Sequence, residues 1–130
     1  MQQLYLLSVV LNLLGGLVLL APRVKDENVR SLAQRPAVRV TVGVLAFLAG
    51  VAKLILTAPG EEVMIVGDLL PALAGMALGV VMVGDVFANR KKAAAAGSTP
   101  GKNLLLRIPI ALIAIAAAIA HFLFPATVIL

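Results

Sequence analysis

Lys53, Asp68, Asp85 and His121 lie within long apolar stretches of the sequence and are the side chains best placed to do chemistry. An ionisable group inside a membrane is costly, so such groups usually face the protein interior, form pairs or line a watery cavity. Lys53, Asp68 and His121 are expected at about the same depth, near one membrane surface. An ion pair between Lys53 and Asp68, with His121 beside it, could bind a proton or a small anion, because histidine changes charge near neutral pH.

The same three residues also have a purely structural interpretation, which the sequence favours. The Lys53 side chain would snorkel to the lipid headgroups, Asp68 would lie near the start of a helix, and His121 would sit in the membrane interface. Each lies only a few residues from the end of its apolar stretch, where the cost of a charge is already falling.

Asp85 belongs near the other membrane surface, close in depth to Arg39 and Arg107. A salt bridge that fixes the ends of neighbouring helices is the role expected for it. Asn12 is the deepest polar side chain, and an interhelical hydrogen bond is expected of it rather than contact with a substrate.

The sequence offers no recognisable catalytic or cofactor chemistry. It has no cysteine and a single histidine, with no serine next to that histidine. The nucleotide motifs GxGxxG and GxxxxGK[ST] and the zinc motif HExxH are absent. We therefore expect a protein that is not an enzyme, with no cofactor and no metal. The aromatic residues are too few to stack nucleic-acid bases, and they are Tyr5, Phe47, Phe87, Phe122 and Phe124.

Composition predicts an all-α integral membrane protein. The chain of 130 residues is 62% hydrophobic and 13% charged, with a mean hydropathy of +1.07, whereas soluble domains are about a quarter charged. One domain, 1–130, with four transmembrane helices in a compact bundle is expected. The predicted spans are 4–21, 38–57, 63–87 and 104–124. Between the first two, a short interfacial helix is expected, with Asp26 and Arg30 at i, i+4 spacing and Val24, Val29 and Leu32 able to face the membrane.

The distribution of charge predicts the orientation. Ten of the eleven basic residues lie in the loops 22–37 and 88–103 or at their helix margins, whereas the loop at 58–62 carries only Glu61 and Glu62. By the positive-inside rule the two basic loops are cytoplasmic and both termini lie outside, in the cytoplasmic (inner) membrane. The basic loops are expected to contact anionic headgroups of the lipid bilayer, and no nucleic-acid partner is needed to explain them.

The two halves of the chain, about 4–57 and 63–126, resemble an internal repeat. An offset of 68 residues aligns Arg39 with Arg107 and Lys53 with His121, and an offset of 59 aligns Asn12 with Pro71. Such a repeat predicts a pseudo-twofold axis along the membrane normal. The alternative is that any two helices rich in alanine or leucine align passably.

Small residues recur at spacings of four or seven residues and so form stripes on single helix faces. The stripes comprise Ser8, Asn12 and Gly16, then Gly43 and Gly50, then Gly67, Pro71, Gly75 and Gly79. Small residues let helices in lipid approach closely, so these stripes predict tight packing in the bundle or a dimer interface. Pro71 could instead act as a hinge, because a proline frees the carbonyl four residues before it.

Two functions are compatible with these features. The first is an interaction or scaffold subunit that packs through its glycine- and alanine-rich faces against itself, as a homo-oligomer, or against a larger membrane protein. The alternative is an oligomeric transporter or channel for protons, a small ion or an amphiphile, which would use Lys53, Asp68 and His121. Its apolar surface alone suggests a third option, lipid binding between the spans.

Overall fold

A computed structural model describes residues 2–56, 62–94 and 104–123. The turn predicted at 58–62, the linker predicted at 93–101 and the tail from 125 lie wholly or largely outside these ranges.

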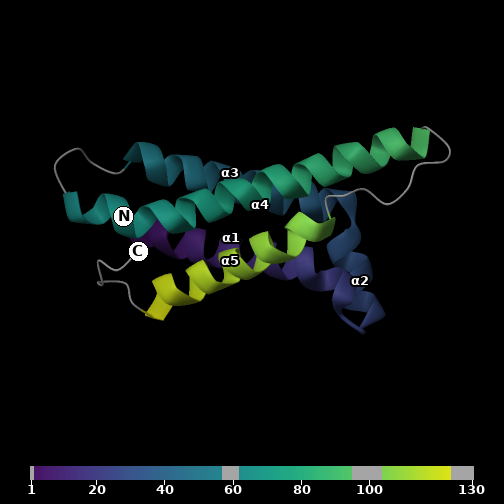
Figure 1. Ribbon diagram of the computed structural model, residues 1–130, viewed down its shortest axis with the longest axis horizontal. Helices are drawn as coiled ribbons and strands as arrows, with labels where there is room; N and C mark the ends of the chain where they lie inside the picture. The colour runs from purple at the N-terminus through teal and green to yellow at the C-terminus, as the bar shows by residue number, and fades with distance from the viewer. Residues whose placement is uncertain (1, 57–61, 95–103, 124–130) are drawn as a thin grey trace.

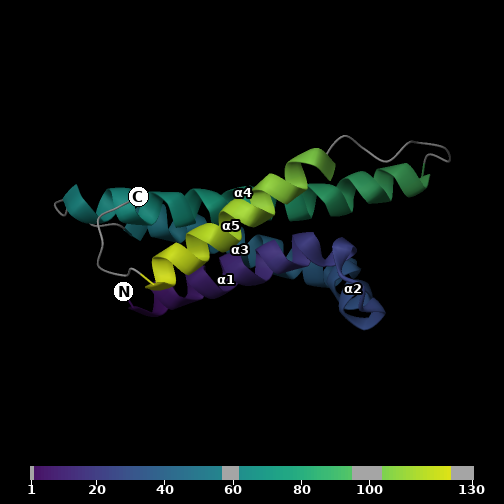
Figure 2. The same cartoon turned by 60° about the horizontal axis from the view of Figure 1, so that its bottom comes forward.

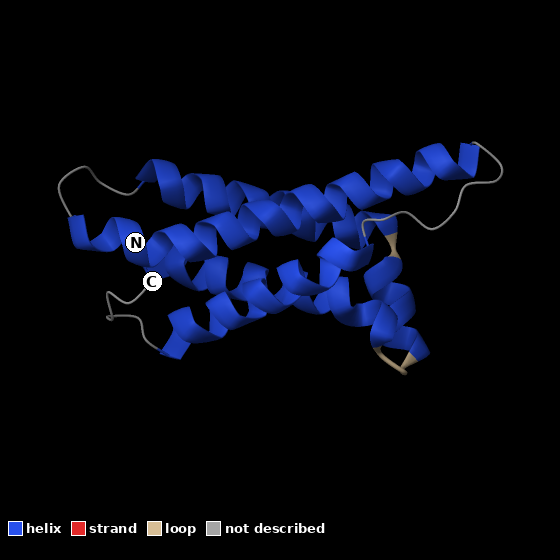
Figure 3. Ribbon diagram, in the orientation of Figure 1, coloured by secondary structure: helices blue, strands red, loops and turns tan. Residues whose placement is uncertain are grey.

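The described part of the chain is helical and contains no strand (Figure 3). Its elements are α1 (Gln2–Leu20), the 3₁₀ turn η1 (Ala21–Arg23), α2 (Glu27–Gln34), α3 (Pro36–Leu56), α4 (Glu62–Ala94) and α5 (Leu104–Leu123). Four of them are long and apolar enough to cross a membrane, over Tyr5–Arg23, Pro36–Ile55, Leu69–Lys91 and Leu106–Leu123. The predicted fold class, an all-α membrane protein with four spanning helices, is confirmed.

The four long helices run along the long axis of the molecule, and α2 lies across one end of the bundle (Figures 1 and 2). The last turns of α4 and the start of α5 lie at the same end as η1 and α2, and we call this the basic end. The start of α1 and the last turns of α3 and α5 lie at the opposite end. With its 33 residues, α4 is about 50 Å long, and Figure 1 shows it projecting beyond its neighbours at the basic end.

Contacts between the helices place α1 and α4 in the centre. These two helices contact each other, and each also contacts α3 and α5. Among the described residues, α3 and α5 have no pair of Cα atoms within 8 Å. The largest buried apolar cluster joins α1, α4 and α5 and consists of Leu19, Ala74, Leu78, Met82, Ala111, Ala114 and Ala117.

The contact between α3 and α4 depends on glycine. A Cβ atom added to Gly79 would lie 2.5 Å from the carbonyl oxygen of Gly43, and one added to Gly50 would lie 2.6 Å from that of Ala72. Both distances are shorter than van der Waals contact, so the two backbones can approach this closely only where a side chain is missing. The two pairs also define an antiparallel register between α3 and α4.

The short helix α2 forms where the sequence predicts an interfacial helix. Its polar contacts differ from the Asp26–Arg30 pair that the i, i+4 spacing suggests. Pro22 lies in η1 just after α1 ends. The Asp26 carboxylate accepts hydrogen bonds from the backbone N–H groups of Asn28 at 2.8 Å and Val29 at 3.2 Å, and so caps α2. Arg30 therefore pairs with Glu27, at 3.2 Å, rather than with Asp26. The predicted outward positions Val24, Val29 and Leu32 are exposed.

Replacing Gly79 by alanine tests the α3–α4 contact. The added methyl group must push the two helices apart, and we expect a loss of about 1 to 3 kcal/mol in the free energy of unfolding. Gly84→Ala is the matched control on the same helix, because a Cβ there meets nothing within 4 Å. Alanine favours helix more than glycine does, so the control should leave the midpoint of thermal unfolding, followed by circular dichroism in detergent, unchanged or raised. Equal midpoints for the two variants would contradict this account of the contact.

Candidate functional site

Asp85 of α4 lies between two arginines from different helices. Its Oδ1 atom is 2.7 Å from Nη2 of Arg107 on α5, and its Oδ2 atom is 3.3 Å from Nη2 of Arg39 on α3. The Asp85 side chain is 2% exposed and that of Arg39 is 7% exposed. The structure thus brings together the three residues that the sequence places near this surface, and we call them the arginine–aspartate cluster.

The arginine–aspartate cluster links α3 and α5, whose backbones do not approach each other in the described part of the chain. Since α3 and α5 have no close Cα atoms among the described residues, the Asp85 carboxylate on α4 is the link between their basic ends. One carboxylate faces two guanidinium groups, so the cluster carries a net charge of about +1 when all three groups are ionised. The Nε atoms of Arg39 and Arg107 are buried and have no hydrogen-bond partner in the described part of the structure.

At the opposite end, Tyr5, Lys53 and His121 come together, and we call them the tyrosine cluster. Nζ of Lys53 lies 3.1 Å from Nε2 of His121 and 5.4 Å from the centre of the Tyr5 ring. The rings of Tyr5 and His121 are 4.4 Å apart between centres and tilted by 39°. The Tyr5 hydroxyl donates a hydrogen bond to the backbone carbonyl of His121. Side chains from α1, α3 and α5 therefore meet at this end.

This geometry changes the interpretation of Lys53. The lysine is 6% exposed and turns inward to His121, so it does not snorkel outward as the structural interpretation from sequence has it. The side chain of Asp68 lies outside the described part of the structure, and its ion pair with Lys53 stays a prediction. Sequence reasoning missed Tyr5, although its position near the start of the first span puts it at the same depth as the other two residues.

The contact between Lys53 and His121 constrains where protons can sit. A lysine ammonium only donates, and a fully protonated imidazole only donates as well. A hydrogen bond between Nζ and Nε2 therefore requires one of the two groups to be neutral, so that a nitrogen lone pair faces the other group's N–H. Tyr5, Lys53 and His121 also interact with further groups around them, so the cluster extends beyond these three side chains.

A third polar contact lies in the interior between the two clusters. Nδ2 of Asn12 donates to the backbone carbonyl of Pro71 at 2.9 Å, and both residues are buried. The bond joins α1 to α4, which is the interhelical role expected of Asn12. It also restrains the backbone at the one proline within α4.

The small-residue stripes lie mainly inside the bundle. Ser8 and Asn12 are 2% and 1% exposed, and Gly16 faces Ala111 and Ile115 of α5. Gly43 and Gly50 of α3 face α4, as Gly75 and Gly79 of α4 face α3. The surroundings of Gly67, which lies in α4, are outside the described part. Within the described residues, no group of three His, Cys, Asp or Glu side chains could hold a metal ion.

Comparison with known proteins finds one protein-family model, which matches residues 1–121. The match runs from the start of the chain to His121 near the end of α5, and so includes both polar clusters. No curated protein and no solved structure matches the chain.

Replacing Asp85 by asparagine tests the arginine–aspartate cluster. The substitution keeps the size of the side chain but leaves the buried Arg39 and the partly buried Arg107 without a counter-charge, and breaking a buried ion pair in this way costs about 3 to 5 kcal/mol. We expect a large drop in the midpoint of thermal unfolding in detergent. Glu27→Gln is the control, because the Glu27 side chain is 85% exposed and its ion pair with Arg30 contributes less than about 1 kcal/mol. A D85N protein as stable as wild type would show that the cluster does not hold the helices together.

Proposed function

The chain belongs to the family whose model matches residues 1–121, and we propose that it is a non-enzymatic scaffold or interaction subunit of a membrane. The observation that carries the proposal is that ionisable side chains of different helices contact one another at both ends of the bundle. Asp85 contacts Arg39 and Arg107 at the basic end, and Lys53 contacts His121 at the opposite end. Such contacts hold the helices in fixed positions, and they favour a rigid bundle over one whose helices move.

The glycine stripes contribute to this rigidity from within. Because Gly43, Gly50, Gly75 and Gly79 pack α3 against α4 in one chain, they are not available to bind a partner. The outward faces carry large aliphatic side chains, among them Leu6, Leu17, Leu48 and Ile113, each about half exposed. A homo-oligomer or a larger membrane-protein partner would pack on such faces, which also suit lipid.

The orientation forms part of the proposal. Among the described residues, nine basic residues and three acids, Asp26, Glu27 and Asp85, lie in the segments that form the basic end. The positive-inside rule places that end in the cytoplasm and both chain termini outside, in the inner membrane.

Native mass spectrometry of the protein, extracted together with a patch of the surrounding membrane, tests the scaffold role. We expect the protein to leave the membrane together with further copies of itself or a constant partner chain. Glu27→Gln should keep this complex. Asp85→Asn, which loosens the bundle, should lose it while the chain still inserts. A wild-type monomer without a co-purifying chain in every extraction would contradict the proposal.

A second candidate, proton transport, is favoured by one observation, the contact of Lys53 with His121. Two ionisable side chains lie within hydrogen-bonding distance here, as they do in many proton pathways through membranes. Against transport, two large apolar side chains in the interior, Leu78 and Met82, are 0% exposed and would have to move for a path to open between the clusters.

Proteoliposomes decide between the two functions. With a pH-sensitive dye inside and a potassium diffusion potential across the membrane, we expect the pure protein to pass no more protons than protein-free vesicles do. A flux that His121→Phe abolishes and Glu27→Gln leaves intact would replace the scaffold proposal with transport.

A further inference from the structure

An outward stripe of apolar side chains follows the seam between α3 and α4 and ends in exposed cations. On α4, Met76, Val80, Val83 and Phe87 recur at spacings of four and three and so share one helix face. Phe47 of α3 lies beside this face, because a Cβ atom added to Gly79 of α4 would be 2.6 Å from the Cβ atom of Phe47. We call this the seam stripe. Val80 is 61% exposed and Phe87 is 56% exposed, so the described bundle leaves the seam stripe uncovered.

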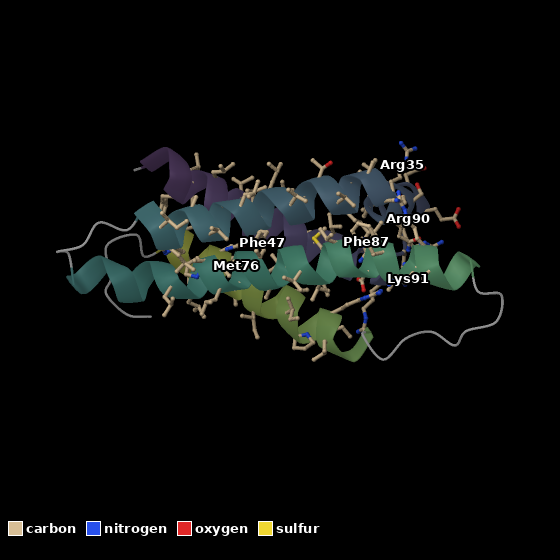
Figure 4. The ribbon with its side chains drawn as sticks, turned by 90° about the horizontal axis from the view of Figure 1, so that it is seen from above. Arg35, Phe47, Met76, Phe87, Arg90 and Lys91 are labelled. Atoms are coloured by element: carbon tan, nitrogen blue, oxygen red, sulfur yellow. The ribbon has the colours of Figure 1, made fainter. Side chains whose placement is uncertain are left out.

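The cations stand at one end of the seam stripe. In the register set by Gly43 opposite Gly79, Arg35 is level with Phe87, and Arg90 and Lys91 follow within about one further turn of α4. All three cationic residues are exposed. Figure 4 shows Arg35, Arg90 and Lys91 gathered at the basic end, with Phe87 and then Phe47 and Met76 following toward the opposite end.

The length of the seam stripe matches one leaflet of a bilayer. Met76 and Phe87 are 11 residues apart, which is about 16 Å along a helix. Half of a hydrocarbon core is about 15 Å thick. An acyl chain that spans one leaflet is therefore long enough to lie along the whole stripe, from Met76 to the level of the cations.

The acids described at this end of the bundle are already engaged with other groups. The acids in the segments that form this end are Asp26, Glu27 and Asp85. Asp26 caps α2, Glu27 pairs with Arg30, and Asp85 is buried between Arg39 and Arg107. Within the described residues, no carboxylate pairs with Arg35, Arg90 or Lys91. These three exposed cations are therefore available to an anionic group from outside the described bundle.

We propose that the seam between α3 and α4 binds an anionic phospholipid. Arg35, Arg90 and Lys91 hold the phosphate-bearing headgroup by charge-assisted hydrogen bonds, and an acyl chain lies along Phe87, Val80 and Phe47. The lipid comes from the leaflet at the basic end. This site requires that the chain spans the membrane and is independent of the scaffold role.

Lipid titration of the full chain in detergent, read by native mass spectrometry, tests the site. The probes are phosphatidylglycerol, phosphatidylcholine and inorganic phosphate. We expect phosphatidylglycerol to be retained at concentrations at least about tenfold lower than phosphatidylcholine, and the double variant R35Q/R90Q to lose most of this preference. R23Q/K25Q is the matched control, since it removes two exposed cations from the same end away from the seam, and it should keep the preference.

A further variant separates the lipid from its headgroup. Phe87→Ala shortens the apolar contact and should weaken phosphatidylglycerol retention without changing the response to phosphate. Circular dichroism confirms that each variant is folded. The proposal is overturned if both double variants lose the preference equally, which would show that only net charge matters. It is also overturned if phosphate displaces the lipid at equal concentration, or if phosphatidylcholine binds as well as phosphatidylglycerol.

Discussion

The bundle depends on one buried carboxylate. Asp85 reaches Arg39 on α3 and Arg107 on α5 at the same time, and these two helices have no close Cα atoms in the described part of the chain. A buried ion pair is weak evidence for stability when it is compared with an apolar core, but removing one partner is strongly destabilising. Asp85 therefore fixes which helices are neighbours at the basic end, and the tyrosine cluster joins the same two helices at the opposite end.

The sequence predicts the parts of this arrangement that depend on hydropathy and charge. Four apolar stretches of sufficient length predict the four spanning helices, and the depth of Asp85 predicts its arginine partners. Depth also predicts that Lys53 and His121 lie at the same level. It does not predict their direct contact, because that requires the order of helices around the bundle, and short connections do not determine this order. Tyr5 was missed for the same reason: a lone tyrosine near a span end is ordinary until α1 is known to lie beside α5.

The spacing of the glycines predicts a close helix contact but does not identify the partner in that contact. The four-residue spacing of Gly75 and Gly79 predicts a close contact, and the structure has one. The pattern does not say whether the partner is another chain or another helix of the same chain, since both present the same small residues. The carbonyl oxygens of Gly43, Ala46 and Ala72 settle this for the described helices, because they already occupy the space beside Gly79, Gly75 and Gly50. Gly50, Gly75 and Gly79 are therefore already packed within the chain.

The internal repeat, which stays a prediction, offers an account of why one acid serves two arginines. The observed set of helix contacts is unchanged when α1 is exchanged with α4 and α3 with α5, as a pseudo-twofold axis requires. Arg39 and Arg107, which both contact Asp85, are equivalent under the 68-residue offset. Under the 59-residue offset, the equivalent of Asp85 is Asp26. In the second half α4 continues as a helix through Asp85, whereas in the first half α1 ends at Leu20, before Pro22. Because α1 ends there, Asp26 does not continue that helix and caps α2 instead. In such a repeat Asp26 and Asp85 would be equivalent positions, and of the two only Asp85 lies between the arginines.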